Sequence, residues 1–103
     1  MTRVTQKHLT LRLNALCELL GLPTGQRWTR NANGDNVCAI GHYAIEPGSR
    51  TYGYHWKVTA TVNDAGGETV IASKQTAGEL LDWINGAIWG VYAERERSAR
   101  NQA

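Results

Sequence analysis

The chain of 103 residues contains no phenylalanine, one methionine, two prolines and two cysteines. Four tryptophans and four tyrosines therefore supply all of its aromatic area, through rings that each carry a hydrogen-bonding group. No apolar run approaches the roughly 20 residues that a membrane-spanning helix needs, and the first ten residues are largely polar. The sequence thus predicts neither insertion into a membrane nor export.

Cysteine and histidine are too sparse to form a recognisable site. Cys17 and Cys38 are expected on a helix and on a strand, and no secretory segment precedes them, which predicts reduced thiols in the cytoplasm. His8, His42 and His55 form no Cys-x-x-Cys or His-x-x-x-His pattern, so no metal ion and no cofactor is expected. A Cys38–His42 dyad is not expected, since four residues along one strand separate two side chains by about 13 Å.

Glycine-rich phosphate-binding motifs are missing as well. Neither Gly-x-Gly-x-x-Gly nor Gly-x-x-x-x-Gly-Lys occurs among the 11 glycines, and Gly66-Gly67 is typical of a turn. Because no nucleophile, metal or phosphate signature is present, the sequence predicts a protein without enzymatic activity.

Residues 52–62 show the clearest secondary-structure pattern in the chain. One face carries Tyr52, Tyr54, Trp56, Val58, Ala60 and Val62, and the other carries Gly53, His55, Lys57, Thr59 and Thr61. This period of two predicts a half-buried β-strand whose second face points to solvent.

Turn-forming residues place further strands on both sides of this one. Asn33-Gly34 predicts a two-residue hairpin that pairs a short strand at 27–30 with a strand at 37–45. Turns are also expected at 47–49 and at 63–67, and a last strand at 68–72. Three or four antiparallel strands result.

Two amphipathic helices are expected to flank the strands. Thr5 can cap the first helix, and Gly21 followed by Pro23 ends it. Thr76 and Glu79 have the spacing of a capping box at the start of the second helix. The expected buried stripes are Leu9, Leu13, Leu16 and Leu20 in the first helix, and Leu80, Ile84, Ala87, Ile88 and Val91 in the second.

Together these elements predict an α+β fold of αβββα order. We expect a three- to four-stranded antiparallel sheet with both helices on one face. Residues 1–93 form the single domain, and the charged residues 94–103 are expected to be a frayed C-terminal tail.

Charge is unevenly distributed along the chain, although its net value is only +2. Residues 1–30 carry five basic side chains and one acidic one, whereas residues 31–92 carry three basic and six acidic ones. A basic end suits a polyanionic partner, so one alternative is a nucleic-acid-binding module. Its contacts would be made by Arg3, Lys7, Arg12, Arg27 and Arg30.

The second helix carries more aromatic area than a small sheet needs. Trp83, Trp89 and Tyr92 lie on or beside it, and large exposed aromatics are typical interface anchors. Gly86 and Gly90 each cost about 1 kcal/mol in a helix interior, a cost that close approach of another backbone can offset. These five residues are the predicted partner-binding site, with a homodimer as one form of partner. A third alternative is a small-ligand site, or sponge, at His42, Tyr43, Tyr54 and His55.

Residues 13–90 resemble a family of small proteins of unknown function from temperate phages and prophages. The shared blocks are Gly21-Leu22-Pro23, Trp28-Thr29-Arg30, residues 36–43, Thr51-Tyr52-Gly53, residues 63–67 and residues 76–81. The order of elements is also similar to that of double-stranded RNA-binding domains, which contact phosphates at the start of their second helix; here residues 73–76 supply one lysine, Lys74.

The phage resemblance implies an accessory protein that acts in the cytoplasm of a bacterial host. Combined with the missing catalytic signatures, it leads to the expectation of a non-enzymatic protein that binds a host macromolecule, with inhibition of a defence system as one such role. A host protein is the expected partner, and nucleic acid is the alternative.

Overall fold

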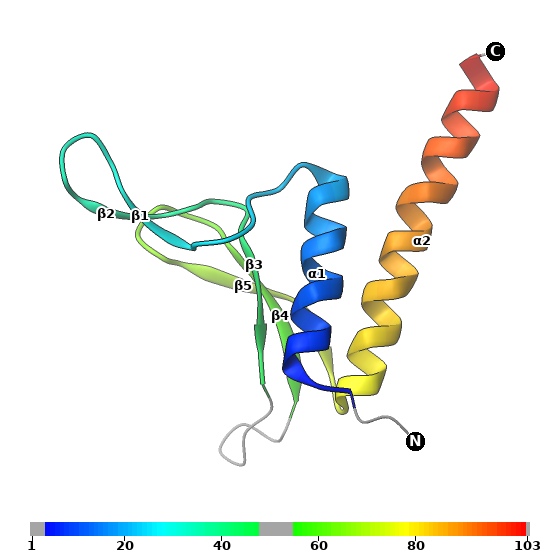
Figure 1. Cartoon of the computed structure of the whole chain (residues 1–103), viewed down its shortest axis with the longest axis horizontal. Coiled ribbons are helices and arrows are strands. Elements are labelled where there is room, and N and C mark those ends of the chain that lie inside the picture. The colour runs from blue at the N-terminus through cyan, green and yellow to red at the C-terminus, as the bar shows by residue number, and fades with distance from the viewer. Residues whose placement is uncertain (1–3, 48–54, 103) are drawn as a thin grey trace.

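The computed structural model describes residues 4–47 and 55–102 (Figure 1). Its elements are α1 (Gln6–Leu20), β1 (Trp28–Arg30), β2 (Asn36–Cys38), β3 (Tyr43–Glu46), β4 (Trp56–Thr61), β5 (Glu68–Lys74) and α2 (Ala77–Gln102). The predicted α+β class is confirmed. The strands form two antiparallel sheets, β1-β2 and β3-β4-β5, so the expected single sheet is in fact a hairpin beside a three-stranded sheet.

Helix α1 begins and ends at the predicted residues. The Thr5 hydroxyl accepts a hydrogen bond from the His8 amide at 3.2 Å, which caps the N-terminus. Gly21 ends the helix with φ of 70°, and the Leu22 amide donates to the Cys17 carbonyl at 2.9 Å. Leu20 belongs to the predicted buried stripe but is exposed. Cys17 is buried in its place, because the face of α1 that is turned to the core includes this residue.

Strand β4 is the centre of the three-stranded sheet. Tyr43 pairs with Ala60 on one side, and Trp56 pairs with Lys74 on the other. The register with β5 shifts between Val58 and Thr59, where β5 contains one extra residue. The sequence pattern places Val58 correctly in the core, but Val62 lies beyond the strand and is exposed.

The sequence predicts that the second face of β4 points to solvent. This prediction is wrong for the C-terminal half of the strand. Thr59 and Thr61 are buried, and the Thr61 hydroxyl accepts a hydrogen bond from Arg27 Nε at 3.1 Å. Cys38 is also close, with its Sγ 3.9 Å from Thr61 Oγ1. The chain around β1 and β2 therefore covers this part of the sheet.

The predicted strand at 37–45 is interrupted at Gly41, whose φ of 88° is outside the strand region. Its two parts, β2 and β3, belong to different sheets. The Asn33-Gly34 pair lies in a five-residue connection in which the Asn31 side chain accepts from the amides of Asn33 and Asp35, instead of in a two-residue turn.

Helix α2 begins at the predicted cap and extends further than expected. The Thr76 hydroxyl accepts from the Glu79 amide at 3.1 Å and donates to the Glu79 carboxylate. Leu80 and Ile84 are fully buried against Leu9, Leu13 and Val58, in one core between the two helices and the sheet.

Residues 94–102, which belong to the expected C-terminal tail, continue α2 in the structure. The radius of gyration, 15.8 Å, exceeds the roughly 13 Å typical of this length. Figure 1 shows the reason: the last turns of α2 project beyond α1 and the sheets. Among residues 4–47 and 55–102, no helix is both long and apolar enough to cross a membrane.

Candidate functional site

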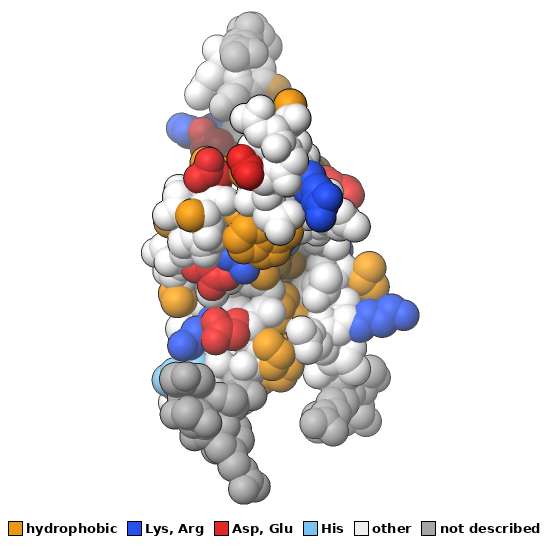
Figure 2. Space-filling view, turned by 90° about the vertical axis from the view of Figure 1, so that its left-hand side faces the viewer, with side chains coloured by type: hydrophobic (Ala, Val, Ile, Leu, Met, Phe, Trp, Pro, Cys, Tyr) orange, Lys and Arg blue, Asp and Glu red, His pale blue; other side chains and the backbone are white. Residues whose placement is uncertain are grey.

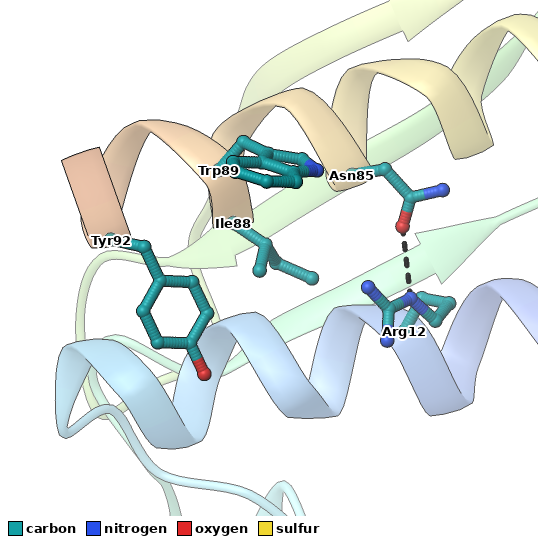
Figure 3. Close-up of a pocket in the computed structure, with 5 residues that line it drawn as sticks. All are labelled: Arg12, Asn85, Ile88, Trp89 and Tyr92. Carbon is teal, nitrogen blue, oxygen red and sulfur yellow. Dashed lines mark hydrogen bonds between the residues drawn. The ribbon is translucent and has the colours of Figure 1, made fainter.

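An open hollow lies between α1 and α2. Figure 3 looks into it, with the strands behind the two helices. It has a volume of about 570 Å³ and is lined by Arg12, Asn85, Ile88, Trp89 and Tyr92. A second hollow shares Arg12, Ile88 and Tyr92 and continues along Ala15, Glu18 and Leu19 to Arg95. We refer to the two hollows together as the outer groove.

Arg12 connects the two walls of the outer groove. Its Nε donates a hydrogen bond to Asn85 Oδ1 at 2.9 Å, between residues 73 positions apart in the chain. Within the described part of the chain, the guanidinium forms no other hydrogen bond, so its remaining N–H groups can bind a carboxylate or another acceptor.

Apolar and aromatic side chains supply the rest of the groove. Ile88 is 7% exposed, whereas Trp89 is 76% exposed and Tyr92 is 54% exposed. Both rings project from α2, so the backbone that carries them is already ordered before a partner binds. An apolar surface beside a cation suits a ligand that is apolar on one side and anionic on the other.

The structure divides the predicted partner-binding residues. Trp89 and Tyr92 lie together in the outer groove, but Trp83 is half-buried and packs against the core. Gly86 and Gly90 are exposed, and a Cβ added at either position would meet no atom within 4 Å. The expected close approach to these glycines is therefore absent among the residues that the structure describes.

The predicted basic residues do not gather on one element. Lys7 is exposed in the first turn of α1, Arg12 lines the outer groove, and Arg30 ends β1; Arg3 lies outside the described residues. Figure 2, which looks onto the side that carries the β1-β2 hairpin in Figure 1, shows Lys and Arg side chains scattered among acidic and apolar ones.

Arg27 has an intramolecular role. It forms an ion pair with Glu68 at 2.5 Å, and its Nη2 donates to the Gly66 carbonyl at 3.0 Å. Its guanidinium also lies 6.0 Å from the ring centre of Trp28. Arg27 thus attaches the β1-β2 hairpin to the β4-β5 turn, which leaves it little capacity for phosphate.

The candidate small-ligand residues are not brought together. His42 lies next to Thr61, whose amide donates to the His42 carbonyl, whereas His55 precedes the opposite end of β4. Six residues of strand correspond to about 20 Å. Tyr43 is half-buried against the core, and Tyr54 lies outside the described residues.

Among the described residues, no hydrogen bond joins a histidine side chain to a cysteine. His42 Nε2 is 3.0 Å from the Gly25 carbonyl oxygen, and its Nδ1 is buried without a partner in the described structure. Cys38 and His42 both lie beside Thr61, because the chain turns at Gly41; the expected 13 Å separation along one strand does not apply. Across the described ranges, no three His, Cys, Asp or Glu side chains could hold one metal ion.

Cys17 is also unsuited to catalysis. Burial raises the pKa of its thiol above the ordinary value of 9.0, so the thiolate is disfavoured at neutral pH. Its place in the core with Leu13 and Leu16 indicates a packing role.

Sequence reasoning identified Trp89 and Tyr92 but missed the groove that they border. Arg12 was assigned to a basic surface, and Asn85 was not singled out. A polar pair between two helices leaves no local periodicity, so the chain carried no signal that these residues meet.

No family model, curated protein or solved structure that was compared with this chain matches it.

Proposed function

We propose that this chain is a non-enzymatic protein-binding domain whose outer groove holds a segment of another protein. The observation that carries this proposal is Trp89, 76% exposed on a helix next to Tyr92 and Arg12. Trp, Tyr and Arg are the residue types that dominate the binding free energy of protein interfaces. A large exposed ring also costs solubility, which a partner that covers it would offset.

The lining predicts the chemistry of the bound segment. An apolar side chain would lie between Ile88, Trp89 and Tyr92, and a carboxylate would bind the free N–H groups of Arg12. Further along, Glu18 and Arg95 both line the groove, so this part carries charges of both signs and favours neither. We therefore propose an amphipathic segment with one acidic residue beside its apolar anchor.

The resemblance to small phage and prophage proteins supports a bacterial host protein as the partner, met in the cytoplasm. We propose a component of a host defence system as the target class. A non-enzymatic accessory protein would inhibit such a component by covering a surface that the component needs. Nuclease treatment separates this proposal from the nucleic-acid alternative, for which the scattered basic side chains provide little support.

The proposal is tested by capture from nuclease-treated host lysate with matched variants. Tyr92→Ala removes one wall of the groove, and Val70→Ala truncates an exposed side chain of β5. We expect a protein captured by the wild type and by Val70→Ala to be lost with Tyr92→Ala. The purified partner should then bind Tyr92→Ala about tenfold or more weakly in calorimetry. Equal capture by all three forms would refute the groove as the site.

A further inference from the structure

Helix α2 carries a second stripe of residues that the fold of one chain leaves unused. The stripe comprises Asp82, Gly86, Trp89, Ala93, Glu96 and Arg100, and all six are exposed. Their spacing alternates between four and three residues, which keeps them on one face. At about 100° per residue, this face lies roughly 160° around the helix from the buried stripe of Leu80, Ile84 and Ile88.

Two features of α2 gain a role if another helix lies along this stripe. Gly86, on the stripe, lowers helix propensity, yet a Cβ built there would meet no described atom within 4 Å beyond the backbone of its own helix. The C-terminal turns project from the body, and Arg95 donates a hydrogen bond to the Leu19 carbonyl of α1. A second helix would approach closely at Gly86 and would cover the projecting turns.

We propose that the occupant is α2 of a second copy, antiparallel to the first. The twofold axis passes through the stripe at the height of Val91 along the helix. Facing residues are then equally distant from Val91 in the sequence. Asp82 faces Arg100 of the second copy, Trp89 faces Ala93, and Gly86 faces Glu96. The stripe is complementary to itself, as a twofold interface requires.

Charge selects this arrangement over the alternatives. A parallel pair would place Asp82, Glu96 and Arg100 each against its own copy, which is repulsive. An antiparallel pair centred on Trp89 would place Asp82 against Glu96. Only the register centred on Val91 pairs all six residues of the stripe with one another, and it places Asp82 against Arg100 at both ends.

Side-chain size agrees with the same register. The Trp89 ring would lie over the small Ala93, and Gly86 would leave room for the methylene groups of Glu96, whose carboxylate can reach water at the edge. Arg100 also pairs with Glu96 of its own helix, with a relative exposure of 74% and 66% for the two side chains. Such exposed pairs are weak, so Arg100 is free to exchange partners.

The dimer adds to the proposed function without depending on it. Trp89 belongs to both surfaces, since it lines the outer groove and lies on the stripe, so the dimer would cover part of its ring. Asn85 and Tyr92 lie on the α1 side of the stripe, so this side of the outer groove stays open. A twofold axis perpendicular to the helix pair keeps this side of both helices on the same face of the dimer. Two grooves would then lie side by side. The interface uses one helix per copy and is small, so we expect a dissociation constant in the micromolar range.

Sedimentation equilibrium of the full chain between about 1 and 200 μM, a range chosen around the micromolar constant expected for a small interface, tests the proposal. We expect the mass to rise from near 11.4 kDa towards twice that value. Asp82→Arg and Arg100→Asp should each weaken association about tenfold or more, and the double variant should restore it. Ser98→Asp lies off the stripe and should have no effect, and circular dichroism checks that every variant keeps its helix.

A second substitution separates packing from helix stability. Gly86→Leu should raise the stability of the isolated helix and yet weaken dimerisation about tenfold or more, because the side chain fills the space that Glu96 of the second copy needs. A wild-type mass of one chain across the whole range would overturn the dimer. A dimer that the double charge exchange fails to restore would overturn this register. Neither result affects the Tyr92→Ala capture experiment, which tests the groove itself.

Discussion

At the scale of single residues, burial changes sharply along α1. Leu13 is 1% exposed and packs among Leu9, Val58 and Ile84, whereas Leu11, two positions earlier, is 60% exposed. The same residue type therefore contributes very differently to stability at two neighbouring positions, since only one of them removes apolar area from water.

We expect Leu13→Ala to lower the free energy of unfolding by about 2–5 kcal/mol, through lost burial and the cavity that remains. Leu11→Ala serves as the control and should change it by less than about 0.5 kcal/mol. Urea denaturation followed by tryptophan fluorescence measures both values. Similar losses for the two variants would contradict the assignment of the buried face.

The Cys17 thiol provides a second test at this scale. Burial raises its pKa above 9.0, so the folded state favours the protonated form more than the unfolded state does. Its contribution to stability is complete below pH 9.0 and is lost as the pH rises from there through the folded-state pKa.

We therefore expect Cys17 to resist alkylation by iodoacetamide at pH 8 in the native protein and to react fully in denaturing urea. Peptide mapping by mass spectrometry distinguishes Cys17 from Cys38. Rapid native alkylation of Cys17, at the rate seen in urea, would show that the core around it opens readily.

At the scale of elements, the β1-β2 hairpin depends on side chains to hold it against the larger sheet. Arg27 provides the ion pair with Glu68 and the hydrogen bonds to Thr61 and Gly66. The Trp28 ring lies against Gly66, where an added Cβ would come within 2.9 Å of it. Glycine is needed there for both its φ of 96° and the close approach.

Arg27→Ala should lower the free energy of unfolding by roughly 1.5–3 kcal/mol, because it removes charge-assisted hydrogen bonds and leaves the Thr61 hydroxyl without its donor. Arg30→Ala, at the exposed end of β1, is the matched control and should cost less than about 0.5 kcal/mol. Hydrogen exchange should also be faster in β1 and β2 of Arg27→Ala alone. Unchanged exchange there would mean that other contacts hold the hairpin.

At the scale of the whole molecule, the projecting end of α2 determines the shape. The molecule measures 48 × 41 × 20 Å, and residues 93–101 are exposed, although Arg95 contacts α1 at the Leu19 carbonyl. Ion pairs within the helix support them, Glu94 with Arg97 at 2.7 Å and Glu96 with Arg100. Such pairs add a few tenths of a kcal/mol each, enough to extend a helix that the core has already nucleated.

A chain that ends at Ala93 should therefore keep its fold. We expect its free energy of unfolding to stay within about 1 kcal/mol of the full chain, because the contacts described for the removed turns are exposed ion pairs and the Arg95–Leu19 hydrogen bond. Its helical circular dichroism signal should fall, and the association proposed for α2 should disappear with Glu96 and Arg100. A loss of several kcal/mol would indicate contacts that the monomer does not show.

The sequence by itself determined the features that depend on near neighbours. The caps at Thr5 and Thr76, the stop at Gly21 and the core position of Val58 were all predicted and are confirmed. In each case the cause is local: a hydroxyl meets an amide three residues away, or a periodicity selects one face. The α+β class follows from the same signals.

Only the tertiary structure decided how distant segments meet. The interruption at Gly41 separates one expected strand into two sheets, Thr61 is buried because the segment around β1 and β2 covers it, and Arg12 meets Asn85 across 73 positions. None of these contacts alters a local pattern, since each depends on the free energy of packing the whole chain. The outer groove belongs to this second group: its aromatic residues were visible in the sequence, but the packing of α1 against α2 made the site.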